Sequence, residues 1–165
     1  MIFKKIILYF FIISIFFNKN AFSLDPDYKL ILLKEGLSSP WSISFINNNE
    51  IIISEKTGKI KLYNQNNGNL IEIKHNLNFS QDNNSQGGLL EILYYDNQIY
   101  ISYSENRGES KLYGPTSTSI AKAKFNKNEL NFTNIFRAEP PIRSPYHFGS
   151  RIVIKDNQLY ASVGE

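Results

Sequence analysis

The chain has 165 residues, which suits one domain or part of one, and its 42% hydrophobic and 14% aromatic content excludes an intrinsically disordered protein. Its formal charge of +3 is that of the first 23 residues, which hold Lys4, Lys5 and Lys19 and no acid. Residues 24–165 therefore have 15 basic and 15 acidic side chains, which excludes the basic excess of a nucleic-acid-binding protein, and no cysteine is present for disulfides or thiolate metal sites.

Residues 1–23 have the pattern of an export signal. A basic MIFKK segment is followed by the uncharged run IILYFFIISIFF, and Ala21 and Ser23 are the small residues of a cleavage site. The apolar run is shorter than the ~20 residues of a membrane-spanning helix, and an uncleaved membrane anchor is the alternative. We expect cleavage after Ser23, no stable membrane insertion after it, and a periplasmic or secreted mature chain.

From residue 28 onward, short apolar or alternating runs are separated by Asn, Gly, Asp and Pro, the residues that favour turns. Convincing helical periodicity is absent from this part of the sequence. Many short strands at this spacing predict an all-β sandwich, barrel or propeller. The runs predict strands at 28–34, 41–46, 51–55, 59–63, 70–74, 89–95, 98–103, 118–125, 130–137, 150–155 and 158–163.

Three segments resemble one another and favour the propeller. They read SISFINNNEIIIS (42–54), LEILYYDNQIYIS (90–102) and SRIVIKDNQLYAS (150–162), each a strand, a tight turn and a second strand. Two more strand candidates lie between successive segments, which gives about four strands per repeat, the number in a propeller blade. Sandwiches rarely repeat internally and the WD40 motif is missing, so we expect an all-β β-propeller of another type.

The loops that precede the three repeated segments are predicted to meet. They read SSPW (38–41), SQGG (85–88) and YHFG (146–149). The first strand of a propeller blade lines the central channel, so the loop before it opens at the channel mouth, where a ligand can bind. We therefore expect Gln86 and His147 to be neighbours.

His147 and Gln86 are the candidate functional residues. A histidine ring exchanges a proton near neutral pH and can act as a general base, and Gly149 beside it allows a bulky ligand or an unusual backbone angle. Gln86 offers an amide donor and acceptor suited to sugar hydroxyls. The alternatives are a histidine that binds a neighbouring backbone carbonyl and an ordinary surface glutamine.

The other candidates have structural interpretations. Trp41 could form an aromatic wall at the same mouth, but we expect it in the core. Glu91 and Arg151 occupy equivalent places on neighbouring inner strands, where they could form an ion pair. His75 is expected at the surface, and NRGESKLYG (106–114) as an exposed hairpin loop. The sequence has no metal-binding, phosphate-loop or nucleophile-elbow motif.

Six stretches of the chain together resemble one known family. They read GLSSPWSISFI, SEKTGKIKLY, SQGGLLEI, IYISYSE, IAKAKF and HFGSRIVIKDNQLYASVGE. In this order, they resemble the N-terminal part of the soluble aldose sugar dehydrogenases, also called glucose/sorbosone dehydrogenases, from about residue 28 to residue 165. The resemblance implies a six-bladed β-propeller that carries pyrroloquinoline quinone (PQQ), with calcium holding this cofactor.

The resemblance also implies roles for single residues. The histidine of the family's H-F-G-S-R segment, here His147, is the general base that takes the proton from the anomeric hydroxyl of an aldose, while hydride passes from that carbon to PQQ. The glutamine of Q-G-G-L-L, here Gln86, contacts the substrate beside that base. Tyr146 stands where some relatives have an acidic sugar contact, so the sequence does not name the sugar.

The family continues well beyond the final SVGE of this chain. The resemblance therefore implies that residues 24–165 are an N-terminal fragment with two repeats and the opening of a third, inactive alone. Most of the family's PQQ-binding basic residues and calcium contacts lie downstream, so the cofactor-binding residues stay unknown, and no metal ligand is expected in this chain. The alternative is an exported, non-catalytic propeller that binds sugars or proteins; the electron acceptor and the oligomeric state stay open.

Overall fold

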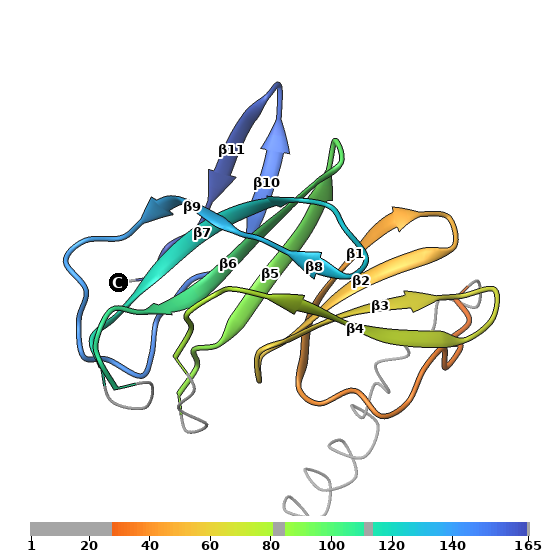
Figure 1. Ribbon diagram of the computed structural model, residues 1–165, viewed down its shortest axis with the longest axis horizontal. Helices are drawn as coiled ribbons and strands as arrows, with labels where there is room; N and C mark the ends of the chain where they lie inside the picture. The colour runs from red at the N-terminus through yellow and green to blue at the C-terminus, as the bar shows by residue number, and fades with distance from the viewer. Residues whose placement is uncertain (1–27, 81–84, 111–113, 165) are drawn as a thin grey trace, which may run out of the picture. The chain divides into compact units, whose positions relative to one another are not determined.

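The structure, a computed structural model, describes residues 28–80, 85–110 and 114–164 (Figure 1). The expected export signal and its cleavage point lie outside the described residues. The chain divides into residues 1–32 and a compact unit of residues 33–165, and the fold below is that of this second unit. In the part that the structure describes, no helix has the length and apolar character to cross a membrane.

The first sheet is an antiparallel meander in which each strand pairs with the next one along the chain. Its first turn is closed by Asn47, whose Oδ1 accepts hydrogen bonds from the N–H groups of Asn49 and Glu50. The strands are β1 (Pro40–Asn47), β2 (Glu50–Glu55), β3 (Lys59–Asn64) and β4 (Asn69–His75), and the short β8 (Glu129–Leu130) adds a parallel partner to β4.

The second sheet repeats this arrangement with four antiparallel strands, in the order β5–β6–β7–β9. The predicted strand at 130–137 is split, because its first residues pair with the first sheet and only its later ones pair with β7. Between the two parts, the side chain of Asn76 binds both the N–H and the C=O of Phe132, at 2.8 and 3.1 Å. The strands are β5 (Leu89–Tyr95), β6 (Gln98–Asn106), β7 (Thr116–Lys124) and β9 (Thr133–Arg137).

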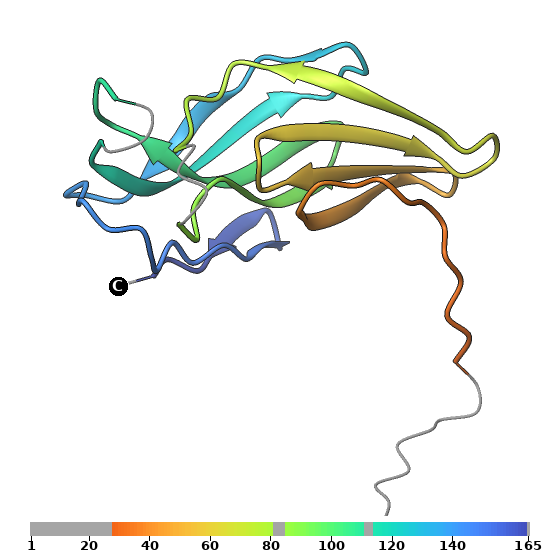
Figure 2. The same cartoon turned by 90° about the horizontal axis from the view of Figure 1, so that it is seen from below.

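A third sheet begins with the hairpin of β10 (Ile152–Lys155) and β11 (Gln158–Ala161), which lies beside the second sheet (Figure 2). The two DNQ segments form the same turn, since Asp96 and Asn97 have φ of 48° and 57°, and the equivalent pair at 156–157 has 51° and 58°. Two consecutive positive φ angles define the type I′ turn of tight hairpins. The predicted all-β repeats are thus confirmed.

The core lies between the first two sheets and is built from the β-branched and leucine side chains that alternate along their strands. Residues of both sheets meet in it at 0–1% exposure: Ile52, Ile60, Ile73, Leu89, Ile92, Ile99 and Ile101. The opposite face of the first sheet buries Ile51, Ile53 and Tyr63. The segment before β1 packs there and accepts a hydrogen bond from the Tyr63 hydroxyl at the Leu33 carbonyl, 2.9 Å away.

The predicted strand at 28–34 is wrong, because these residues form no strand. Its apolar side chains predicted burial, yet Leu30 is fully exposed and Leu32 is 72% exposed. A strand needs a partner for its backbone groups as well as an apolar sequence, and the described residues offer this segment none.

Each sheet is hydrogen-bonded to the start of the next by an equivalent serine. Ser54 Oγ donates to the Leu90 carbonyl at 2.5 Å, and Ser102 Oγ donates to the Ser150 carbonyl at 2.6 Å. Ser54 and Ser102 are 48 residues apart, end the first two repeated segments, and are 0% and 1% exposed. The repeat seen in the sequence is therefore also a repeat of contacts between sheets.

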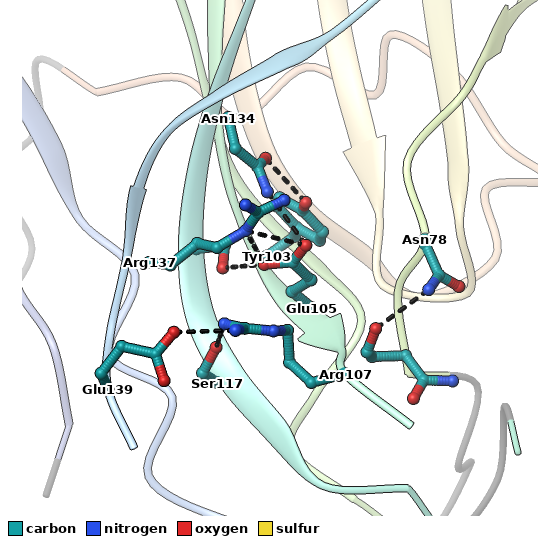
Figure 3. A network of polar contacts seen from close by, with 10 residues as sticks. Asn78, Tyr103, Glu105, Arg107, Ser117, Asn134, Arg137 and Glu139 are labelled. Carbon is teal, nitrogen blue, oxygen red and sulfur yellow. Dashed lines mark hydrogen bonds and ion pairs between the residues drawn. The ribbon is translucent and has the colours of Figure 1, made fainter. Parts of the chain in front are cut away.

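A polar network centred on Glu105 joins the strands of the second sheet (Figure 3). Its carboxylate accepts hydrogen bonds from Arg137 Nε at 2.8 and 3.1 Å, from Ser119 Oγ at 2.6 Å and from Asn134 Nδ2 at 3.0 Å. Asn134 Oδ1 in turn accepts one from the Tyr103 hydroxyl at 2.8 Å. Burial, and secondarily the charge of Glu105, raises the pKa of Tyr103 to about 12.

Replacing Tyr103 by phenylalanine is expected to remove part of the alkaline sensitivity of the fold. Below pH ~10 the tyrosine is neutral in both the folded and unfolded states, but between pH ~10 and ~12 only the unfolded state loses its proton. The native chain should lose on the order of 2 kcal/mol of unfolding free energy there that the variant keeps. Urea unfolding across this pH range measures the difference. If the free energy of unfolding fell equally with pH in the two proteins, the prediction would be contradicted.

Candidate functional site

The structure brings the loops of Gln86 and His147 together. The backbone N–H of His147 donates to Gln86 Oε1 at 3.0 Å, although the two residues are 61 apart in the sequence. The Gln86 N–H in turn donates to the Pro145 carbonyl at 2.7 Å. Both residues are exposed. Because Oε1 is engaged, Gln86 keeps its two Nε2–H donors for a ligand beside the histidine ring.

The His147 loop holds an unusual backbone. His147 has φ of 66° and Gly149 has φ of 55°, a region that is unfavourable for a residue with a Cβ, so the unusual angle that the sequence allowed at Gly149 is present. Phe148 between them is buried and anchors the loop. Gly164 packs against it so closely that a Cβ there would lie 1.8 Å from the His147 carbonyl oxygen. The position of the imidazole thus depends on the segment after β11.

Replacing Gly164 by alanine is expected to displace the His147 loop. The added methyl would overlap the His147 carbonyl, a backbone atom that has no rotamer to move away. We expect a loss of about 1–3 kcal/mol of unfolding free energy. The amide resonance of His147 should also shift, since its N–H is bound to Gln86. A variant with the native melting temperature and an unchanged resonance would show that the loop does not need this glycine.

The Gln86 loop is held by the turn between β2 and β3. A Cβ at Gly88, which has φ of 129°, would lie 2.1 Å from the Lys56 carbonyl oxygen, and one at Gly87 would lie 2.5 Å from Ser104 Oγ. The Lys56 ammonium group also donates a hydrogen bond to the Ser85 carbonyl. The glycine pair of SQGG is therefore required by close approach of neighbouring strands, and it leaves Gln86 on a fixed backbone.

A pocket of about 240 Å³ lies beside His147. Tyr146 is half exposed at its edge, with its ring 6.2 Å from the imidazole, centre to centre, and nearly perpendicular to it. In the sequence, Tyr146 stood out only because some family members have an acidic residue there. Its position directly before His147 is the signal that could have identified it as an aromatic wall of the site. The remaining lining mixes hydroxyl and apolar groups with the carboxylate-bearing Glu139, and includes Thr116, Thr118, Ile142 and Phe148.

The sequence predicted Trp41 in the core, and this is wrong, because its side chain is 47% exposed. It lines a different hollow of about 500 Å³ together with Glu91 and Arg151. The predicted ion pair between these two residues is confirmed, with Arg151 Nη1 3.1 Å from Glu91 Oε1. Trp41 shares one face of β1 with the exposed Ile43 and Phe45, so this face has no neighbouring sheet among the described residues.

His75 is half-buried and hydrogen-bonded, where the sequence predicted a plain surface residue. Its Nδ1 accepts the Leu77 N–H at 3.2 Å, so the proton is on Nε2, which donates to the Gly58 carbonyl at 2.9 Å. His75 therefore closes a turn at the end of β4. His147 lines the 240 Å³ pocket, and His75 is not among the residues around it.

The described residues do not form a complete cofactor site. No group of three or more His, Asp or Glu among them could hold a metal ion. Three cations near the two loops have partners: Lys56 bonds the Ser85 carbonyl, Arg107 pairs with Glu139 at 2.7 Å, and Arg151 pairs with Glu91 at 3.1 Å. The arrangement places a proton-accepting ring beside amide donors, which suits the binding of a hydroxyl compound.

Comparison with known proteins places this chain in a family. A family model described as Glucose / Sorbosone dehydrogenase matches residues 37–165. The chain is 25% identical to the aldose sugar dehydrogenase YliI of Escherichia coli and 26% identical to the protein slr1608 of Synechocystis. These alignments cover 94% and 86% of this chain, but the chain spans only 43% and 36% of those relatives.

Solved structures share the fold. A crystal structure of a glucose dehydrogenase matches with a TM-score of 0.74 and 28% identity, over 84% of this chain and 41% of that one. The PQQ-bound aldose sugar dehydrogenase of Streptomyces coelicolor matches with a TM-score of 0.68 and 22% identity, over 84% of this chain and 41% of that one. The two sheets and the hairpin are thus part of a β-propeller.

Proposed function

The chain belongs to the glucose/sorbosone dehydrogenase family, and on this basis we propose that it supplies the substrate-binding side of an aldose dehydrogenase site. The contact that carries the proposal is the 3.0 Å hydrogen bond from the His147 N–H to Gln86 Oε1, which places a proton acceptor next to free amide donors on an exposed surface.

His147 is the general base of this proposal. Its imidazole takes the proton of the anomeric hydroxyl, and the hydride of the same carbon, with its two electrons, would pass to a bound quinone, which converts the aldose to a lactone. Gln86 Nε2 donates to a sugar oxygen, and Tyr146 covers one face of the sugar beside the imidazole. The pocket of about 240 Å³ next to the ring receives the part of the substrate away from the reacting carbon.

PQQ is the proposed cofactor because the Streptomyces coelicolor neighbour binds it. When bound, it would supply the electron sink for the hydride. The described residues supply the substrate side of this proposal, and no cluster of three acidic or histidine side chains among them is suited to a metal ion, so no further step is assigned to PQQ or calcium. Since the chain spans about two fifths of its relatives, we propose that their other blades provide these contacts and that this chain alone does not turn over.

Dye reduction tests the function. Residues 37–165 are joined to the remaining blades of a matched glucose dehydrogenase, and aldose oxidation with PQQ and calcium is compared with that of the His147→Ala variant. The proposal expects activity in the joined ring, a large loss in the variant, and none for this chain alone. Sugar binding without oxidation in the joined ring would instead support a non-catalytic propeller.

We also propose that the protein is exported, from the pattern of residues 1–23. After expression with its own N-terminus, the periplasmic or secreted protein should have Leu24 as its first residue by mass spectrometry. An intact Met1 on the exported protein would indicate a membrane-tethered form instead.

A further inference from the structure

The segment that follows His147 is held by two hydroxyl groups of the second sheet. Thr118 Oγ1, on β7, donates a hydrogen bond to the Phe148 carbonyl. Ser102 Oγ, on β6, donates to the Ser150 carbonyl at 2.6 Å. Both donors are buried, at 4% and 1% exposure. Removing either would leave a carbonyl without its partner in a site with little access to water, which costs more than an exposed hydrogen bond.

The first repeat contains the equivalent of the Ser102 bond. Ser54 binds the Leu90 carbonyl, four residues after Gln86, as Ser102 binds the carbonyl three residues after His147. One sheet thus fixes the loop of the next in both places. At the second place Thr118 adds a bond directly after the histidine.

The His147 loop needs such support because of its backbone. His147 has φ of 66°, a left-handed conformation that a residue with a Cβ avoids unless contacts hold it. Before the ring, the N–H is bound by Gln86 Oε1. After it, the hydroxyl groups of Thr118 and Ser102 bind the carbonyls of Phe148 and Ser150. The loop is therefore restrained on both sides of the imidazole.

We propose that Thr118 and Ser102 are positioning residues, which hold His147 in its left-handed conformation against Gln86. This inference rests on the proposed role of His147 as base. Each hydroxyl acts by fixing the backbone from which the imidazole projects, because each is bonded to a backbone carbonyl of the His147 loop. Thr118 also lines the pocket beside His147, so the test follows the loop backbone and not the reaction rate.

The test compares two substitutions at Thr118 in the full chain. Thr118→Val keeps the shape of the side chain and removes the hydroxyl, whereas Thr118→Ser keeps the hydroxyl and removes a methyl. Amide exchange of His147 is followed by NMR. In Thr118→Val we expect amide exchange of His147 to be about fivefold faster, the effect of one lost hydrogen bond, and its amide resonance to shift. In Thr118→Ser the exchange rate should stay within about twofold of the native rate.

Two further measurements separate positioning from stability. The amide of Ile99, which is 0% exposed on β6 between β5 and β7, reports global opening. Ser44→Ala removes another hydrogen bond between the first two sheets, the one from the Tyr94 N–H at 3.0 Å, far along β5 from the loops. It should leave the His147 resonance unchanged. If Thr118→Val does not fold, Ser102→Ala makes the test through the Ser150 carbonyl. Ser102 Oγ also accepts the Glu91 N–H at 3.1 Å, so the Glu91 amide is followed beside that of His147.

Three results would overturn the proposal: equal effects of valine and serine at position 118, an unchanged His147 resonance in both Thr118→Val and Ser102→Ala, or equal acceleration at Ile99 and His147. These outcomes concern the loop alone and leave the base assignment standing. The base assignment is tested separately, by dye reduction in the joined ring that carries His147→Ala.

Discussion

Replacing His147 by alanine is expected to slow aldose oxidation in the joined ring by about 10²–10⁴-fold, the usual contribution of a positioned general base. The proton of the anomeric hydroxyl leaves in the transition state, so kcat and kcat/KM should fall together while KM stays close to its native value. Steady-state dye reduction over a range of aldose concentrations measures both constants. Equal rates for the two rings would remove His147 from the reaction.

His75→Gln is the matched control for this result. It also removes one of the chain's two histidines, but at a turn, where Nε2 binds the Gly58 carbonyl. An amide can replace that donor, so the joined ring should keep its activity. If both histidine variants lost activity equally, the loss would reflect damage to the fold and not the loss of a base.

Replacing Lys61 by methionine is expected to lower the free energy of unfolding by about 3–5 kcal/mol, the cost of breaking a buried ion pair by removing one partner. Glu55 is 0% exposed, and its Oε1 accepts bonds from Lys61 Nζ at 2.8 Å and from the Ser38 N–H at 2.7 Å. Its Oε2 has no hydrogen-bond partner in the described part of the chain. Without Lys61, the carboxylate would stay buried and lose its counter-charge. Urea unfolding at neutral pH measures the loss.

Two variants test the cause. Lys59→Met makes the same substitution on the same strand, but Lys59 pairs with Glu72 at 3.2 Å between side chains that are 50% and 56% exposed, so it should cost less than about 1 kcal/mol. The double variant Glu55→Gln/Lys61→Met removes both charges and should recover much of the stability. The burial argument is wrong if Lys61→Met unfolds as easily as Lys59→Met does.

The sequence predicted the repeats and the meeting of Gln86 with His147 because both depend on local patterns. Alternation of apolar residues and the DNQ turns determine the hairpins, and three equivalent hairpins place the loops before them at equivalent positions. The sequence could not show that Gln86 Oε1 binds the His147 backbone, since this bond depends on a positive φ at a residue other than glycine.

Predictions that depended on partners from other parts of the chain were less successful. Trp41 is apolar, and its exposure depends on whether another sheet packs on β1, which its local sequence does not reveal. His75 has a polar environment of two backbone groups, and one of them, the Gly58 carbonyl, lies on another turn. The strand predicted at 28–34 failed for the same reason, since apolar content does not supply a pairing edge.

The Gln86 side chain joins two repeats through its bond to the His147 backbone, and this constrains the exchange of loops between relatives. The loops at 85–88 and 144–149 share one amide, so neither is an independent cassette. A graft that imports only the histidine loop of a relative would meet a foreign glutamine and lose the backbone geometry that it needs. Exchange of the two loops together would keep the bond between Gln86 Oε1 and the His147 N–H, and with it the backbone geometry of the histidine loop.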